Sequence, residues 1–82
     1  MKKVVYVCVD DVRFRNHICH AFSEEEDAQN WCLEQYRNRY GEDWVKLVDE
    51  YGTEKYGTEN GFIGYLTSGN AWPYTYYDVD CN

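Results

Sequence analysis

The segment SEEEDAQNWCLEQYRNRYG, residues Ser23–Gly41, carries the clearest helix signals in the chain. Ser23 and Glu26 are spaced as an N-terminal capping box, in which side chains satisfy the free N–H groups of a first turn. Four consecutive acidic residues follow Ser23 where a helix dipole is positive, and two arginines lie near the opposite end. Gly41 suits the left-handed conformation that ends many helices. Together these signals predict a helix between Ser23 and Gly41.

This predicted helix has one largely apolar face. Its members recur at intervals of three and four residues, which is typical of a helix that packs on a core. They are Ala28, Trp31, Cys32, Gln35, Tyr36 and Arg39, with Leu33 and Tyr40 widening the stripe.

The residues before the helix predict a β-hairpin. Val4–Val9 and His17–Phe22 are rich in β-branched, aromatic and small apolar residues, and residues 10–16 form a polar loop around Arg13. One face of the hairpin would hold Val5, Val7, Val9, Cys19 and Ala21, and the other Tyr6, Cys8, Ile18, His20 and Phe22. Because neither face is polar, we expect another element to cover part of the second.

The segment after Gly41 predicts a second helix. Glu42–Tyr51 has apolar residues at 44, 45, 47, 48 and 51, and Gly52 is available as a stop. A strand is the alternative, although it would place Asp49 on the same face as Leu47. Residues 51–61 contain YGTE twice and have the composition of an acidic loop.

The C-terminal residues predict a closing hairpin. Phe62–Thr67 and Trp72–Val79 read as strands around a turn at 68–71, with Pro73 at the start or on an edge of the last strand. The whole chain, residues 1–82, is then one α+β domain. Its expected order is ββααββ, with an antiparallel four-stranded sheet and one or two helices.

Charge limits the classes of partner. The net charge is −7, and residues 23–60 carry eleven acids against four bases. Such a chain should repel nucleic-acid backbones, so we expect no direct nucleic-acid binding and a partner with a basic surface. The longest apolar run, Val4–Val9, is too short to cross a membrane. We expect a protein of the cytoplasm that does not bind membranes, with its four cysteines reduced.

The sequence offers little that could support catalysis. Cys8, His17, Cys19 and His20 could approach one another across the hairpin, but no C-x-x-C pair is present. The set of nucleophile, base and transition-state stabiliser cannot be completed either. We therefore expect no enzymatic activity, catalytic residue or cofactor. A minimal Cys/His metal-binding domain remains an alternative.

Two groups of residues are candidates for partner binding. Carboxylates along rigid helices can imitate nucleic-acid phosphates, and exposed Trp and Tyr side chains often dominate interfaces. The acidic group is Glu24, Glu25, Asp27, Glu34, Glu42, Asp43, Asp49, Glu50, Glu54 and Glu59, and the aromatic group is Trp72, Tyr74, Tyr76 and Tyr77. In the last strand we expect one aromatic row to pack on the helices and the other to be partly exposed.

The layout also resembles a class of known proteins. The MKKVVYV opening strand, the hairpin ending in Phe22-Ser23, the SEEEDA helix start and the aromatic-acidic C-terminal strand resemble small acidic phage-encoded proteins of the host-takeover and anti-defence type. Anti-CRISPR and anti-restriction inhibitors are examples of that class. The resemblance is one of layout and assigns no individual residue a role.

It implies a non-enzymatic inhibitor in the host cytoplasm that binds a nucleic-acid-handling protein machine, such as a CRISPR or restriction effector. A second alternative is a protein of anti-defence type that sequesters a nucleotide or other small ligand at an oligomer interface. Homodimer formation is left open by the sequence.

Overall fold

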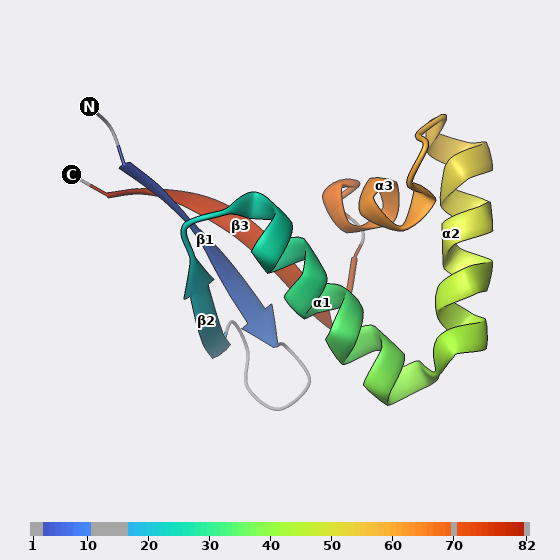
Figure 1. The fold of residues 1–82 in the computed structure, drawn as a ribbon, viewed down its shortest axis with the longest axis horizontal. Helices are drawn as coiled ribbons and strands as arrows, with labels where there is room; N and C mark the ends of the chain where they lie inside the picture. Colours follow the sequence, from blue (N-terminus) through green and yellow to red (C-terminus); the bar gives the residue numbers. More distant parts are fainter. Residues whose placement is uncertain (1–2, 11–16, 70, 82) are drawn as a thin grey trace. The chain divides into compact units, whose positions relative to one another are not determined.

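The fold is α+β, with three helices and a three-stranded antiparallel sheet in the part of the chain that the structure describes (Figure 1). The structure is a computed structural model and describes residues 3–10, 17–69 and 71–81. The elements are β1 (Lys3–Asp10), β2 (His17–Phe22), α1 (Glu25–Tyr40), α2 (Glu42–Tyr56), α3 (Gly61–Thr67) and β3 (Tyr74–Cys81). The predicted α+β class is confirmed. The four-stranded sheet and the order ββααββ are wrong, because the fifth element is a helix and the order is ββαααβ.

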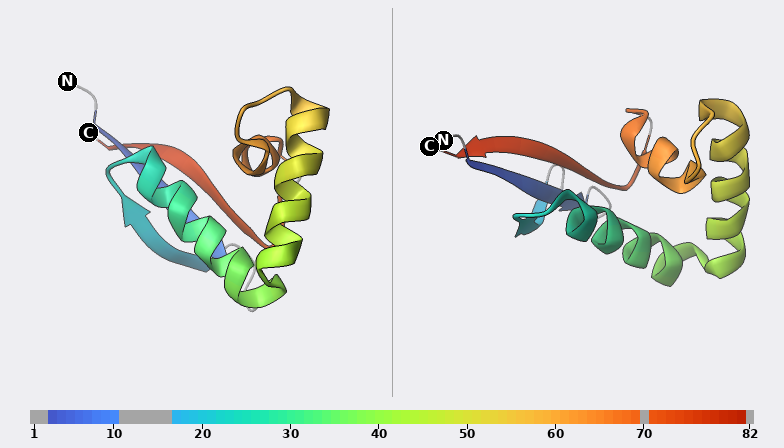
Figure 2. Two further views of the ribbon diagram at one scale, coloured as in Figure 1. Left: turned by 45° about the vertical axis from the view of Figure 1, so that its right-hand side comes forward. Right: turned by 45° about the horizontal axis from the view of Figure 1, so that its top comes forward.

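The N-terminal strand lies at the centre of the sheet, whose order is β2-β1-β3 (Figure 2). Tyr6 is paired with Phe22 and Cys8 with His20, so these four residues share a face as predicted. A register shift between Cys8 and Val9 then pairs Val9 with Ile18 instead of Cys19. Asp10 belongs to β1, where it pairs with His17, and the rest of the predicted loop lies outside the described residues.

Helix α1 confirms the predicted amphipathic helix, with a small shift at its start. The Ala28 N–H donates to the Glu24 carbonyl over 3.4 Å, so the N-cap position is occupied by Glu24 and not by Ser23. At the other end, Gly41 has a φ of 95° and its N–H donates to the Arg37 carbonyl over 2.9 Å. Its carbonyl then accepts from the Val45 N–H at 3.3 Å, so one glycine ends α1 and begins α2.

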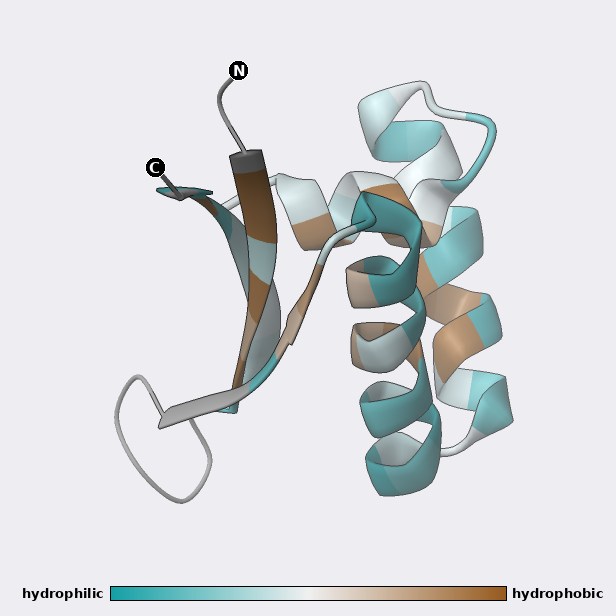
Figure 3. Cartoon of the chain, turned by 60° about the vertical axis from the view of Figure 1, so that its left-hand side comes forward, coloured by the Kyte–Doolittle hydropathy of each residue, from teal (hydrophilic) through white to brown (hydrophobic). Residues whose placement is uncertain are grey.

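Contacts divide the chain into two compact units, and α1 contributes to both. The sheet unit comprises residues 1–32 and 72–82, and the helical unit comprises residues 33–71. In the sheet unit, β1 is strongly hydrophobic (Figure 3) and the first turns of α1 cover the face that carries Cys8. Cys8, Ala28 and Cys32 are fully buried there. The predicted cover over this face is therefore present.

In the helical unit, α2 runs five residues beyond the predicted end. The prediction of a helix over Glu42–Tyr51 is confirmed, but Gly52 is an interior residue of α2 and not its stop. The stop is Gly57, which has left-handed φ and ψ of 66° and 30° and donates its N–H to the Thr53 carbonyl over 3.1 Å. Most of the predicted loop at 51–61 is therefore helical.

The segment predicted as the third strand is helix α3. Two hydrogen bonds at the start of α3 explain why. The Asn60 side chain accepts from the Ile63 N–H at 3.2 Å, and Asp49 of α2 accepts from the Phe62 N–H at 2.9 Å. These bonds satisfy two free donors of the first turn, while Phe62 and Leu66 are buried together, one turn apart. Residue 70 of the predicted turn lies outside the described residues.

Backbone contact joins α2 to α3, which lie beside each other in Figure 1. A Cβ atom built on Gly52 would lie 1.9 Å from the Gly61 carbonyl oxygen, and one built on Gly61 would lie 1.9 Å from the Asp49 carbonyl oxygen. Only two glycines allow the helices to approach this closely. Around the contact, Tyr36, Phe62 and Leu66 are almost completely buried. None of the described helices is long and apolar enough to cross a membrane.

Candidate functional site

The acidic residues predicted to bind a partner divide between the two units. Glu24, Glu25 and Asp27 lie exposed at the start of α1 in the sheet unit. The other seven lie in the helical unit, from Glu34 of α1 to the exposed Glu59 between α2 and α3. Each group therefore has to be considered as a surface of its own unit.

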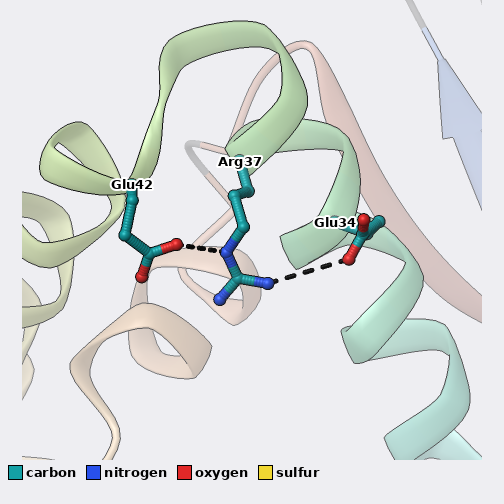
Figure 4. A network of polar contacts seen from close by, with 3 residues as sticks. All are labelled: Glu34, Arg37 and Glu42. Carbon is teal, nitrogen blue, oxygen red and sulfur yellow. Dashed lines mark hydrogen bonds and ion pairs between the residues drawn. The ribbon is translucent and has the colours of Figure 1, made fainter.

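Two carboxylates of the helical unit are engaged at the junction of α1 and α2. Arg37 forms a hydrogen-bonded ion pair with Glu42, and a second ion pair with Glu34 at 3.7 Å (Figure 4). All three side chains are about half exposed, so the network contributes modestly to stability. Its main effect is to engage two of the candidate carboxylates and to offset one of their two negative charges.

Asp49 has a structural role in the helical unit. It is only partly exposed, and its carboxylate accepts the Phe62 N–H that begins α3. A negative charge at this position also complements the helix dipole. Asp49 is therefore less available to a partner than its place in the sequence implies, although its proposed binding role stays a prediction.

On the outer face of α2, charge and exposed apolar area occur together. We define this face by five exposed residues, which are Asp43, Leu47, Glu50, Tyr51 and Glu54. At 100° per residue, Asp43, Glu50 and Glu54 fall within 40° of one another, and Leu47 and Tyr51 continue the same side. Leu47 is 65% exposed and Tyr51 is 52% exposed. Hydrophobic and hydrophilic residues adjoin one another along α2 in Figure 3.

One end of this face is ordered by a lysine. Lys55 Nζ donates to the Tyr51 hydroxyl over 2.9 Å and lies 5.3 Å from the centre of the Tyr51 ring. This hydrogen bond raises the pKa of Lys55. Tyr51, Glu54 and Lys55 line an open depression of about 380 Å³. The Tyr51 ring is thus held against the helix with its surface available to solvent.

The aromatic residues of the last strand are divided between a buried and an exposed group as predicted, but β3 begins at Tyr74 and not at Trp72, and Trp72 is exposed instead of packing with Tyr74. Tyr74 is buried against Trp31 of α1, with 6.1 Å between the ring centres, and Tyr76 packs beside the same helix. On the other face of β3, Tyr77 is 45% exposed. Trp72, which precedes the strand, is 58% exposed. Trp72 and Tyr77 are therefore the accessible members of the predicted aromatic group.

Tyr76 fastens β3 to the first turns of α1. Its hydroxyl donates to the Glu25 carboxylate over 3.0 Å and accepts from the Gln29 side chain at 2.9 Å. We expect Tyr76→Phe to lower the free energy of unfolding by about 1 kcal/mol, because both bonds depend on the hydroxyl. Urea unfolding measures this loss. Tyr77→Phe is the matched control on the opposite face and should change it by less than about 0.5 kcal/mol.

The same tyrosine gives a pH dependence of known sign. Burial, together with the neighbouring Glu25 carboxylate, raises the pKa of Tyr76 above that of an unfolded tyrosine. The folded state therefore holds the proton more tightly, and this contribution to stability is complete below about pH 10 and is lost as pH rises through the folded pKa. Tyr76→Phe should lessen the decline in stability above pH 10. An unchanged decline would contradict this assignment.

The partner-binding groups predicted from the sequence leave out three exposed residues. Asp78 and Asp80 are exposed and alternate with Tyr76 on the α1-facing side of β3, where they are paired with Tyr6 and Val4. They add negative charge to the unit that holds the first turn of α1. Leu47 belongs to the apolar positions that predict α2, and it is among the most exposed apolar residues described. The strand alternation of 74, 76, 78 and 80 was a signal for the first two.

Of the residues in the metal hypothesis, the structure describes the side chains of Cys8 and His20. Cys8 and His20 are cross-strand partners, and the Cys8 thiol donates to the Ala28 carbonyl of α1 over 3.7 Å. The side chains of His17 and Cys19 lie outside the described part of the chain. Within that part, no three His, Cys, Asp or Glu side chains are arranged to hold a metal ion.

Comparison with known proteins assigns no function to this chain, so its function has to be inferred from its own residues. No family model, no curated protein and no solved structure matches this chain.

Proposed function

We propose that this protein is a non-enzymatic inhibitor that binds a basic surface of another protein through the outer face of α2. The observation that carries the proposal is the presence of exposed Leu47 and Tyr51 beside three carboxylates on one helix. Carboxylates attract a basic surface over a long range, and apolar side chains supply the contact that excludes water. The outer face of α2 offers both kinds of side chain, which supports this mode of binding.

The charge of the chain favours a protein partner over a nucleic acid. The net charge is −7, and unbalanced acids occur in both units. The acidic residues in the first turn of α1 and Asp78 and Asp80 of β3 are exposed in the sheet unit, and they add to the field that steers association. A basic surface that normally holds nucleic acid fits this charge, and a CRISPR or restriction effector in the host cytoplasm is the partner class we propose.

The first experiment captures partners of the tagged protein from a bacterial lysate over a series of salt concentrations. We expect a discrete nucleic-acid-handling complex whose recovery falls steeply between low and moderate salt. Recovery that does not depend on salt would rule out electrostatic docking, and the absence of any captured protein would favour the sequestering alternative.

Variants of the outer face of α2 then locate the contact. We expect Leu47→Ala combined with Tyr51→Ala to weaken binding roughly 10- to 100-fold, mainly through faster dissociation. Glu50→Gln combined with Glu54→Gln should slow association and flatten the salt dependence. Glu59→Gln tests the member of the predicted acidic group that is exposed but lies beyond α2, and it should change association less than the double glutamine variant. Equal affinity of all these variants and the parent protein would place the interface elsewhere.

A further inference from the structure

The two buried cysteines of the sheet unit are closely opposed. Cys8 projects from the central strand toward α1, and Cys32 lies one helical turn after Ala28, whose carbonyl contacts the Cys8 thiol at 3.7 Å. Neither residue is exposed, and both are free thiols. Ala28 and Cys32 are four residues apart in α1 and lie on the same face of the helix, which places the Cys32 thiol beside that of Cys8. They therefore approach each other from elements that are 24 positions apart in the sequence.

We propose that Cys8 and Cys32 form a redox-convertible pair, which a small hydroperoxide joins into a disulfide between β1 and α1. Both thiols are enclosed in the same buried space between β1 and α1, and closure to the bonding distance of about 2.05 Å requires only local adjustment of the two side chains. Hydrogen peroxide is the suitable class of oxidant because the site is fully buried, and a small neutral molecule enters during brief local opening.

The environment of the pair assigns a different role to each sulfur. The hydrogen bond from Cys32 lowers the pKa of Cys8, while the same bond and burial raise the pKa of Cys32. Cys8 is therefore the sulfur that attacks the peroxide, because the thiolate is the nucleophile. Cys32 retains its proton until it attacks the oxidised sulfur of Cys8.

The reaction is balanced in two steps. The Cys8 thiolate attacks one peroxide oxygen, the O–O bond breaks, and a sulfenic acid and one water are formed. The Cys32 sulfur then attacks the sulfenic sulfur, and the hydroxyl leaves as a second water with the Cys32 proton. Two thiols and one hydrogen peroxide give one disulfide and two waters, and two electrons pass from sulfur to oxygen.

The test uses the full chain with Cys19→Ser and Cys81→Ser, so that Cys8 and Cys32 are the only thiols. The folded protein is treated with hydrogen peroxide, then unfolded and alkylated for mass spectrometry. We expect a loss of about 2 Da, no alkylation, a Cys8–Cys32 linkage in the non-reduced digest, and full reversal by dithiothreitol. The bond closes a 25-residue loop, so the melting temperature should rise by about 10 °C.

The control is the same chain with Cys32→Ala added. It should show oxygen adducts on Cys8 or an unreacted thiol, with no loss of 2 Da and no rise in melting temperature. The proposal is overturned if both thiols remain alkylatable after peroxide treatment of the parent variant. It is also overturned if they accumulate sulfinic acid, or if the disulfides formed join separate chains. The unsubstituted protein, mapped in the same way, provides the answer should the double serine variant fail to fold.

Discussion

Gly52→Ala is expected to separate α2 from α3 and to lower the free energy of unfolding by about 3 kcal/mol or more. The new Cβ would lie 1.9 Å from the Gly61 carbonyl oxygen and 2.5 Å from its carbon. Both are backbone atoms, so no side chain can rotate away and the helices must move apart. That movement would uncover Phe62 and Leu66, which are 3% exposed. Urea unfolding followed by circular dichroism measures the loss.

The sign of this effect is what makes it informative. In an ordinary helix interior, glycine to alanine stabilises by up to about 1 kcal/mol because alanine loses less backbone freedom. Glu50→Ala is the control on the exposed side of the same helix and should change stability by less than about 0.5 kcal/mol. A Gly52→Ala protein as stable as the parent would show that α2 and α3 do not pack through these glycines.

The same glycine shows where sequence reasoning reaches its limit. Gly52 follows an amphipathic run, which is the usual place for a helix stop, and the local pattern alone predicts the end of α2 there. The helix continues because Gly61, nine residues later, packs on Gly52. Likewise, Phe62, Gly64 and Leu66 alternate as in a strand, yet Asp49 and Asn60 begin a helix there. In both places a contact between two elements overrides the structure that the local sequence pattern predicts.

Elements that carry their own start and stop signals were predictable. Helix α1 has acidic residues at its beginning, an apolar stripe whose members Ala28, Cys32 and Tyr36 are fully buried, and Gly41 at its end. The first hairpin also follows from its β-branched residues, and only the bulge after Cys8 changes its register. These features depend on residues within a few positions of one another, which is why the sequence displays them.

The candidate site was predictable only in its composition. The sequence identifies the acidic residues, but only the structure separates Glu42 and Asp49, which are engaged within the protein, from Asp43, Glu50 and Glu54. The apolar residues at 44, 45, 47, 48 and 51 have the spacing of a helical stripe, but of these α2 buries only Val45, together with Gly52, and leaves Leu47 exposed. Because a glycine contact sets the buried face, that rotation of the helix could not be found from hydrophobic spacing.

Tyr36→Ala is expected to cost about 3–5 kcal/mol of stability, which is the range for removing a buried aromatic ring. Tyr36 is fully buried at the centre of the helical unit. The centre of its ring lies 5.3 Å from that of Trp44, 5.6 Å from that of Phe62, and 6.0 Å from those of Tyr40 and Tyr65. Alanine would leave a cavity bordered by four rings, which cannot collapse without moving three helices. Urea unfolding and near-ultraviolet circular dichroism measure the loss of stability and of aromatic packing.

Tyr40→Ala is the matched control because Tyr40 stacks on the same tryptophan, with 4.7 Å between ring centres, but is 39% exposed. We expect it to cost about 1–2 kcal/mol, since less area leaves water and no closed cavity forms. Tyr36→Phe keeps the ring and separates its packing from the hydroxyl. If Tyr36→Ala costs no more than Tyr40→Ala, the aromatic cluster does not organise the helical unit. The outer face of α2 would then need another support, because Trp44 is the residue through which this cluster holds α2 to α1 and α3.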